Sequence, residues 1–207
     1  MNNKNINIIG LGGHSKVAFE IAKLSNYTIE GFYDDNQSLH HIQFCGIEVK
    51  GGINLLSDSN SIIAIGNNKI RKTILSKVNN INWISLIHPK SILSDYANIG
   101  DGCLMSAGSI VQSFSSIGDH CIINTNSSID HDCILNDFVH ISPSATLCGN
   151  VVIGEGTHVG AGATIIPNIK IGKWCVIGAG AVVTKDVPDY SLVIGVPGKI
   201  IKTLINE

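Results

Sequence analysis

The chain has 207 residues, and its 14 basic and 16 acidic side chains give a formal net charge of −2. This balance argues against the basic surface that nucleic-acid binding requires. No apolar run is long enough to span a membrane and no signal peptide is present, so we expect a cytoplasmic protein. A chain of this length forms one large domain or two small ones.

Residues 1–88 are predicted to form a small α/β domain. Its short apolar strands are expected at residues 6–9, 28–33, 61–65 and 83–87, and its helices at 16–24 and 70–78. Strands that alternate with helices indicate a parallel sheet, in which ligands bind at the carboxyl ends of the strands.

A glycine-rich loop joins the first strand to the first helix. It runs from Gly10 to Ser15 with the sequence GLGGHS, and the acids Asp34 and Asp35 follow about twenty residues later. Glycines at such a turn let backbone N–H groups approach phosphates at a helix N-terminus. The third glycine of a dinucleotide fingerprint is missing and the segment is short, which favours a nucleotide with one base over NAD. The alternative is that the glycines only form a tight turn.

From Ile99 to Val183 an apolar residue recurs at every sixth position, and all of these residues except Met105 are aliphatic. The residue four positions later is nearly always small. The residue directly after the aliphatic is often Gly, Asn or Asp, which tolerate turn conformations. A period of six fits neither an amphipathic helix nor an ordinary strand. It indicates short extended pieces wound into a parallel β-helix of about five eighteen-residue coils, stacked roughly 4.8 Å apart.

The chain has six cysteines and no CxxC motif. Four of them, Cys103, Cys121, Cys133 and Cys175, fall in the column of small residues. We therefore expect buried structural thiols rather than a disulfide framework or a zinc site.

Together the two halves resemble the hexapeptide-repeat sugar acyltransferases of bacterial glycan biosynthesis. The chain is most similar to the nucleotide-linked 4-amino-sugar N-acetyltransferases, and the sialic acid O-acetyltransferases share the layout. The resemblance is carried by Gly12-Gly13-His14, Asp34-Asp35, residues 64–68 (AIGNN), Asn124-Thr125, Asp130-His131-Asp132, His140, Cys148-Gly149-Asn150 and residues 195–199 (GVPGK).

The resemblance implies a half-Rossmann-like domain over 1–88 that binds a nucleotide sugar. It implies a left-handed parallel β-helix with a C-terminal tail over 89–207. The activity implied is acetyl transfer from acetyl-CoA to the 4-amino group of a UDP- or dTDP-linked 4-amino-4,6-dideoxy sugar. Transfer would be direct, without an acyl-enzyme or a metal. Sugar O-acetylation of the sialic acid type is the alternative. The family's trimers imply a homotrimer with active sites between subunits.

The resemblance also assigns site residues. The catalytic pattern of a histidine followed by an acid is matched by His131 and Asp132, although either Asp130 or Asp132 would orient the imidazole. Acetyl-CoA contacts are expected at His140, Ala161 and Ala179. Contacts to the nucleotide sugar are expected at Gly12, Gly13, His14, Asp34, Asp35, Gly66 and Asn124.

The phase of the repeat adds an independent argument. His131 lies two residues after Ile129, so it is expected outside the apolar interior, where the flanking acids raise the basicity of its ring. His140 is nine residues further on, or half a coil. It therefore lies on a different side of the prism from His131, and the two would meet only if a second protomer supplied one of them.

Two other residues are placed by whole coils. Gly149 lies eighteen residues after His131, one coil above it. There it would leave room for the thioester and offer an N–H to the developing oxyanion. His158 lies eighteen residues after His140 and would either line the same groove or cap a turn.

Four other functions are less consistent with the sequence. A metal-dependent lyase of the carbonic anhydrase type uses two histidines about five residues apart, a spacing that the repeat does not show. An NAD-dependent enzyme is disfavoured by the short front domain. Binding of acetyl-CoA would argue against a non-catalytic nucleotide-sugar sensor, and a β-helix with no catalytic role is the remaining alternative.

Overall fold

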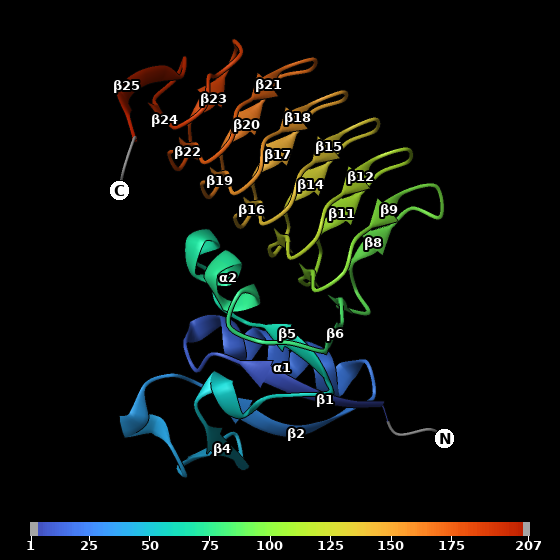
Figure 1. Cartoon of the computed structure of the whole chain (residues 1–207). Coiled ribbons are helices and arrows are strands. Elements are labelled where there is room, and N and C mark those ends of the chain that lie inside the picture. Colours follow the sequence, from blue (N-terminus) through green and yellow to red (C-terminus); the bar gives the residue numbers. More distant parts are fainter. Residues whose placement is uncertain (1–3, 205–207) are drawn as a thin grey trace.

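The computed structural model describes residues 4–204 as an α/β front domain beside a stack of β-coils (Figure 1). The front domain contains β1 (Lys4–Ile9), α1 (Gly13–Leu24), β2 (Tyr27–Tyr33), the 3₁₀ turn η1 (Gln37–Leu39), β3 (Gln43–Phe44), β4 (Ile47–Gly51), the 3₁₀ turn η2 (Ile53–Leu55), β5 (Ser59–Ile63), α2 (Asn68–Leu75) and β6 (Ile81–Trp83). Its sheet has the order β3-β4-β2-β1-β5-β6, and only the β3–β4 pair is antiparallel. The expected parallel sheet is therefore confirmed.

The structure corrects several boundaries in this domain. Strand β5 spans Ser59–Ile63 rather than residues 61–65. The strand expected over 83–87 divides, because β6 ends at Trp83 and the next strand, β7 (Leu86–Ile87), pairs with the β-helix. Strand β7 thus lies just before the expected division between residues 88 and 89, which stays a prediction. Helix α1 begins at Gly13, three residues earlier than expected, and α2 ends at Leu75 rather than at residue 78. The β3–β4 hairpin was not anticipated.

The β-helix consists of two-residue strands up to β23, followed by a terminal hairpin. After β7 its strands are β8 (Ile92–Leu93), β9 (Asn98–Ile99), β10 (Leu104–Met105), β11 (Ile110–Val111), β12 (Ser116–Ile117), β13 (Ile122–Ile123), β14 (Ser128–Ile129), β15 (Ile134–Leu135), β16 (His140–Ile141), β17 (Thr146–Leu147), β18 (Val152–Ile153), β19 (His158–Val159), β20 (Thr164–Ile165), β21 (Lys170–Ile171), β22 (Val176–Ile177), β23 (Val182–Val183), β24 (Ser191–Ile194) and β25 (Lys199–Thr203).

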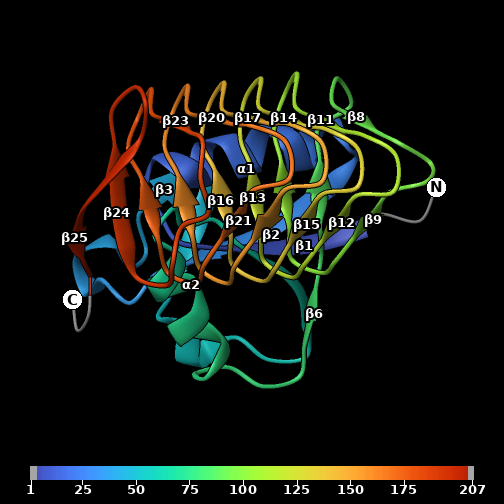
Figure 2. The ribbon, with the colours of Figure 1, turned by 90° about the horizontal axis from the view of Figure 1, so that it is seen from above.

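These strands form three sheets, one on each side of the prism. We name them the β16 sheet (β25-β24-β22-β19-β16-β13-β10-β7), the β14 sheet (β23-β20-β17-β14-β11-β8) and the β15 sheet (β21-β18-β15-β12-β9). Equivalent strands of successive coils lie side by side (Figure 2). Ile122 pairs with His140, and His140 with His158, so each coil spans eighteen residues. The expected fold class is confirmed.

The interior of the prism is built from the two columns that the hexad predicts. The aliphatic residues from Met105 to Val183 form one buried cluster, and Ile99 packs against its end. Cys103, Cys121, Cys133 and Cys175 lie in the same cluster as free thiols, which confirms their structural role. Outside the prism, Leu86, Leu104 and Ile122 of the β16 sheet join the core of the front domain, with Ala18 and Ile21 of α1. One side of the prism is thus covered by the front domain.

The turns differ from the expectation in one respect. From Ile99 to Ile177, the left-handed backbone conformation lies three residues after each apolar residue of the hexad, for example at His120 (φ 53°), Asn126 (φ 55°) and Asp132 (φ 59°), and not directly after it. A glycine directly after the aliphatic serves close packing between coils instead. A Cβ at Gly154 would lie 2.5 Å from the backbone carbon of Gly172 in the next coil. Within residues 4–204, no helix has the length and apolar character needed to cross a membrane.

Candidate functional site

A histidine–aspartate pair stands at the turn between β14 and β15. The Nδ1 atom of His131 lies 2.7 Å from Oδ2 of Asp132, and both side chains are more than half exposed. Because a carboxylate only accepts, Nδ1 carries the proton and Nε2 presents its lone pair to solvent. The hydrogen bond to Asp132, followed by the charge of Asp130, raises the pKa of His131 above its usual value. The ring is therefore a stronger base than an isolated imidazole.

The neighbouring acid, Asp130, contacts the backbone of His131 instead of its ring. Its Oδ1 accepts a hydrogen bond of 2.8 Å from the backbone N–H of His131, whereas the ring donates its hydrogen bond to Asp132. Beneath the turn, the buried Ser115 hydroxyl donates to the carbonyl of Asp130 at 2.6 Å and accepts from the N–H of Cys133 at 3.0 Å. The backbone that carries His131 is thus held from both sides, and the geometry makes Asp132 the residue that orients the imidazole.

Gly149 lies directly above His131, as the eighteen-residue period predicted. A Cβ at this position would lie 2.6 Å from Cε1 and 2.8 Å from Nε2 of His131, so the imidazole fills the space that a side chain would need. The thioester was expected to enter this space, but the ring of His131 occupies it. Among the described residues the N–H of Gly149 has no acceptor.

A second group of histidines is buried where the β16 sheet meets the front domain. His140 is 5% exposed, and its ring centre lies 5.4 Å from that of His14 and 4.7 Å from that of His158. Burial, and then the neighbouring His158, lower the pKa of His140 to about 2. This imidazole is neutral at every physiological pH.

The hydrogen bonds of His140 fix its tautomer. Its Nδ1 lies 3.3 Å from the carbonyl oxygen of Gly66, which only accepts, so Nδ1 is the protonated nitrogen. Its Nε2 therefore accepts from the Asn124 amide nitrogen at 3.2 Å. In this state both ring nitrogens of His140 have hydrogen-bond partners, and the ring is held in one orientation. The next histidine in the column, His158, contacts the Ser142 hydroxyl through Nε2 at 2.8 Å and packs on His140, so it belongs to the same group.

The glycine loop forms the mouth of a hollow of about 370 Å³. The hollow is lined by residues 10–14, Asp34 and residues 64–66. The carboxylate of Asp34 accepts a 3.0 Å hydrogen bond from the N–H of Leu11, which ties the end of β2 to the loop. The loop leads directly into α1, whose first turn directs free N–H groups to this end of the sheet.

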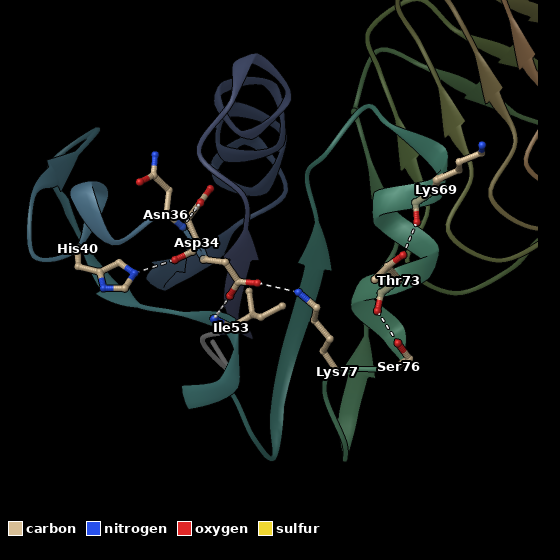
Figure 3. A network of polar contacts seen from close by, with 9 residues as sticks. Asp34, Asn36, His40, Ile53, Lys69, Thr73, Ser76 and Lys77 are labelled. Atoms are coloured by element: carbon tan, nitrogen blue, oxygen red, sulfur yellow. Dashed lines mark hydrogen bonds and ion pairs between the residues drawn. The ribbon is translucent and has the colours of Figure 1, made fainter. Parts of the chain in front are cut away.

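An adjoining hollow of about 360 Å³ shares Gly10, Asp34 and Ile65 with the first. Its lining includes Ile53, Ile70 and Lys77. Figure 3 shows Ile53 and Lys77 on two sides of a shared carboxylate, which belongs to Asp35. Burial raises the pKa of Asp35, but hydrogen bonds from Lys77 and the Ile53 N–H outweigh it, and the net pKa is lowered. Asp35 Oδ2 lies 2.9 Å from Lys77 Nζ, and the carbonyl of Asp34 accepts from His40 at 2.8 Å. The hollow thus joins apolar walls to fixed carboxylates.

Within one chain, the predicted residues fall into two separate groups. The glycine loop, Gly66, His14, Asn124 and His140 come together at the junction of the two domains. Ala161 and Ala179 continue the edge of Asn124, in exposed turns that lead from the β16 sheet to the β14 sheet. His131, Asp132 and Gly149 lie on the next edge of the prism, between the β14 and β15 sheets.

Sequence reasoning missed Arg71, which is 1% exposed in α2. The buried residues of this helix, Asn68, Arg71 and Ile74, recur at intervals of three, and that spacing was the available signal for a buried arginine.

Within residues 4–204, no three His, Cys, Asp or Glu side chains are grouped so as to hold a metal ion.

Two family models match the chain. The PglD N-terminal domain matches residues 5–78, and the bacterial transferase hexapeptide (six repeats) matches residues 150–185. A search of curated proteins found no match.

Several solved structures are similar over nearly the whole chain. A perosamine N-acetyltransferase from Caulobacter crescentus, in complex with CoA and GDP-perosamine, is 33% identical with a TM-score of 0.88, and the match covers 96% of this chain and 97% of that one. The acetyltransferase domain of PglB from Neisseria gonorrhoeae is 38% identical with a TM-score of 0.89, and covers 96% and 100%. WeeI from Acinetobacter baumannii is 26% identical with a TM-score of 0.85, over 96% and 100%. The PglB domain is also known in complex with acetyl coenzyme A.

Proposed function

Because this chain belongs to the hexapeptide-repeat sugar acyltransferases that carry a PglD-type N-terminal domain, we propose that it acetylates a nucleotide-linked amino sugar. The acyl donor is acetyl-CoA. The acceptor is the 4-amino group of a 4-amino-4,6-dideoxyhexose linked to a nucleoside diphosphate. UDP and dTDP are the carriers expected from the sequence, and GDP joins them because a similar enzyme was solved with GDP-perosamine.

The front domain supports the acceptor half of this proposal. The hollow at the glycine loop suits a diphosphate, since Gly12 and Gly13 leave the backbone open at the start of α1. A Cβ at either glycine would meet no atom within 4 Å, so the space in front of them is free. The adjoining hollow, with its apolar walls and the Asp34 and Asp35 carboxylates, suits a base and the hydroxyl groups of a ribose. The sugar then points toward the β-helix.

The histidine–aspartate pair supports the catalytic half. The neutral 4-amino group attacks the thioester carbonyl and forms a C–N bond, while Nε2 of His131 accepts the proton that the amine loses. The hydrogen bond of Asp132 to Nδ1 favours the imidazolium that results. As the tetrahedral intermediate collapses, the C–S bond breaks and His131 returns the proton to the CoA sulfur. Both substrates react directly, so no acyl-enzyme forms. The free N–H of Gly149 is positioned beside this base to bind the oxyanion.

The separation of the two groups on one chain supports an active site shared between subunits. His131 lies on the edge between the β14 and β15 sheets, whereas the glycine loop lies where the front domain meets the β16 sheet. A neighbouring protomer would therefore bring its His131 to the acceptor held by the first. A homotrimer with threefold symmetry closes such an arrangement with three equal sites. Acetyl-CoA would then lie along the edge of Ala161 and Ala179, with His140 at its inner end.

The observation that carries the proposal is the 2.7 Å contact between His131 and Asp132, which leaves Nε2 free to accept a proton. The test is thiol release from acetyl-CoA with a panel of UDP-, dTDP- and GDP-linked 4-amino-4,6-dideoxyhexoses, each beside its 4-hydroxy analogue. We expect release with at least one amino sugar and none with its hydroxyl analogue. Turnover of the hydroxyl analogue alone would make the protein an O-acetyltransferase, and release with neither would contradict both functions.

A further inference from the structure

Arg71 is the most deeply buried charged side chain of the junction between the two domains. It lies on α2, is 1% exposed, and donates four hydrogen bonds to backbone carbonyl oxygens. Two acceptors belong to the front domain, Ile65 at 3.0 Å and Gly66 at 3.1 Å. The other two belong to turns of the β-helix, His120 at 3.1 Å and Phe138 at 2.9 Å. One guanidinium therefore joins both domains.

The partners of Arg71 are neutral, and none of them is a carboxylate. Burial lowers the pKa of Arg71 to about 10, so it remains a cation at pH 7. Buried charges are normally paired with an opposite charge, because carbonyl dipoles replace water without neutralising the ion. The positive charge of Arg71 is thus left without an anionic partner in the described part of the chain.

The carbonyl of Gly66 connects this charge to the glycine loop. It accepts from Arg71 and also lies 3.3 Å from Nδ1 of His140, and Gly66 itself lines the loop hollow. The residues lining that hollow include no lysine or arginine, and they include the carboxylate of Asp34. A diphosphate bound there would find backbone N–H groups but no cation within the lining.

We propose that Arg71 is a specificity-determining residue, whose buried charge attracts the diphosphate of the acceptor from behind Gly66. This inference rests on the proposed function and assigns a source of charge to the same site. A buried cation acts through a medium of low dielectric constant and is poorly screened by salt, so it attracts an anion across a layer of backbone. Burial, and then the charge of Arg71, lower the pKa of His14, which is one of the residues that line the hollow.

The test compares the affinity of each variant for a nucleoside diphosphate with its affinity for the matching nucleoside, measured by calorimetry. The probes are UDP with uridine, dTDP with thymidine and GDP with guanosine, and the pair that the wild type binds best is used. The ratio of the two dissociation constants isolates the contribution of the phosphates, since damage to the fold weakens both ligands together.

Arg71→Met removes the charge, and Arg71→Gln removes it while keeping an amide that donates to carbonyl oxygens. Arg71→Lys keeps the charge with fewer hydrogen bonds. The matched control is Lys72→Met, which removes one positive charge from the exposed side of the same helix, where Lys72 pairs with Glu155. Asn68→Ala is the structural control, because it breaks the 2.9 Å bond between α2 and the carbonyl of Gly156 without changing the charge.

We expect Met and Gln at position 71 to reduce the preference for the diphosphate about ten-fold, and Arg71→Lys, Lys72→Met and Asn68→Ala to retain it. In turnover assays the neutral variants should raise KM for the nucleotide sugar and leave kcat nearly unchanged. Equal losses for nucleoside and diphosphate, or an equal effect of Lys72→Met, would overturn the proposal. A wild type that binds no nucleoside diphosphate would instead refute the acceptor site itself, and with it the role of Arg71.

Discussion

The imidazole of His131 occupies the space that a side chain at position 149 would need. Its Cε1 atom would lie 2.6 Å from a Cβ at Gly149, one coil above. The ring of the proposed base is therefore positioned both by the missing side chain at Gly149 and by the hydrogen bond to Asp132. A side chain at position 149 should therefore displace the ring of His131.

Gly149→Ala should lower kcat about 100-fold, with a much smaller effect on the affinity for acetyl-CoA. The added methyl group forces the ring away from Asp132, and a misplaced base loses its alignment with the amine. Steady-state kinetics on the active sugar nucleotide measures this. Gly31→Ala is the control, since a Cβ there would likewise meet only a side chain, 2.7 Å from Cδ of Lys50, in strand β2 of the front domain. Comparable kcat values for the two variants would remove the role of Gly149.

His131→Ala should lower kcat by roughly 10²–10⁴-fold, which is the usual contribution of a positioned general base. The affinity for both substrates should change little, because the residue is an exposed group on a turn that Ser115 and Asp130 hold through the backbone. Kinetics and calorimetry on the same preparation separate the two effects. Near-normal turnover would show that another group accepts the proton.

Asp132→Asn should move the acid limb of the kcat/KM profile to lower pH. The base must be unprotonated to act, and the carboxylate raises its pKa by stabilising the imidazolium. Removing that charge lowers the pKa, so the fraction of active enzyme rises at acidic pH while the maximal rate falls. The substrate amine contributes the same limb to both enzymes, and the difference between the profiles reports the histidine. An unmoved limb would contradict the orienting role of Asp132.

The buried histidines should make the protein sensitive to acid. His140 and His120 have pKa values of about 2 and about 4, each lowered first by burial. In the unfolded chain both bind a proton near pH 6.5, so the unfolded state holds more protons below that pH and stability falls as the pH falls. Each group contributes a slope of about 1.4 kcal/mol per pH unit between 6.5 and its folded value.

Urea unfolding at pH 7 and pH 5, at one protein concentration, measures this loss. His140→Gln should be less sensitive to the change in pH than the wild type. His41→Gln, on a side chain that is 76% exposed, should match the wild type. Equal pH dependence of all three proteins would show that His140 is not a source of the acid sensitivity.

Two inactive variants should restore activity when they assemble together. His131→Ala lacks the base, and Gly13→Glu places a carboxylate where the diphosphate would bind, at a position with no atom within 4 Å of a Cβ. In the proposed cyclic trimer, one of the three interfaces of each mixed assembly combines an intact loop with an intact His131. Co-expression with two affinity tags yields the mixed species. Activity no greater than that of the parents would place the whole site within one chain.

The prism could be predicted well because its pattern repeats along the chain, so that each position depends only on its place in the hexad. Each aliphatic position of the hexad is decided by local burial, and the same eighteen-residue period predicted that Gly149 lies over His131 and His158 over His140. The loop from Gly10 to Ser15 was equally legible, since a strand-to-helix turn is local. The largely apolar segment 83–87 (WISLI) hid the division between β6 and β7, because hydrophobicity alone does not say which sheet a residue joins.

The unpredicted part of the site depends on contacts between distant segments. Arg71 reaches His120 and Phe138, which are 49 and 67 residues away in the sequence. Those two residues lie one coil apart, but no periodic pattern links either of them to Arg71. The choice between Asp130 and Asp132 is decided by the backbone, because Asp132 has the left-handed conformation with φ 59° and its side chain turns toward the ring. Two acids that flank a histidine look equivalent until that conformation is known.

The eighteen-residue coil also limits how this chain accepts insertions. An extra hexad between His131 and His140 would rotate everything after it by one side of the prism, and would transfer His140 from the sheet that faces the front domain to a solvent-exposed one. An insertion of a full coil would only translate the later residues along the axis by one layer. The β-helix can therefore change length only by whole coils of eighteen residues if the later residues are to keep their sides of the prism. The distance between the proposed donor and acceptor sites would change in the same steps.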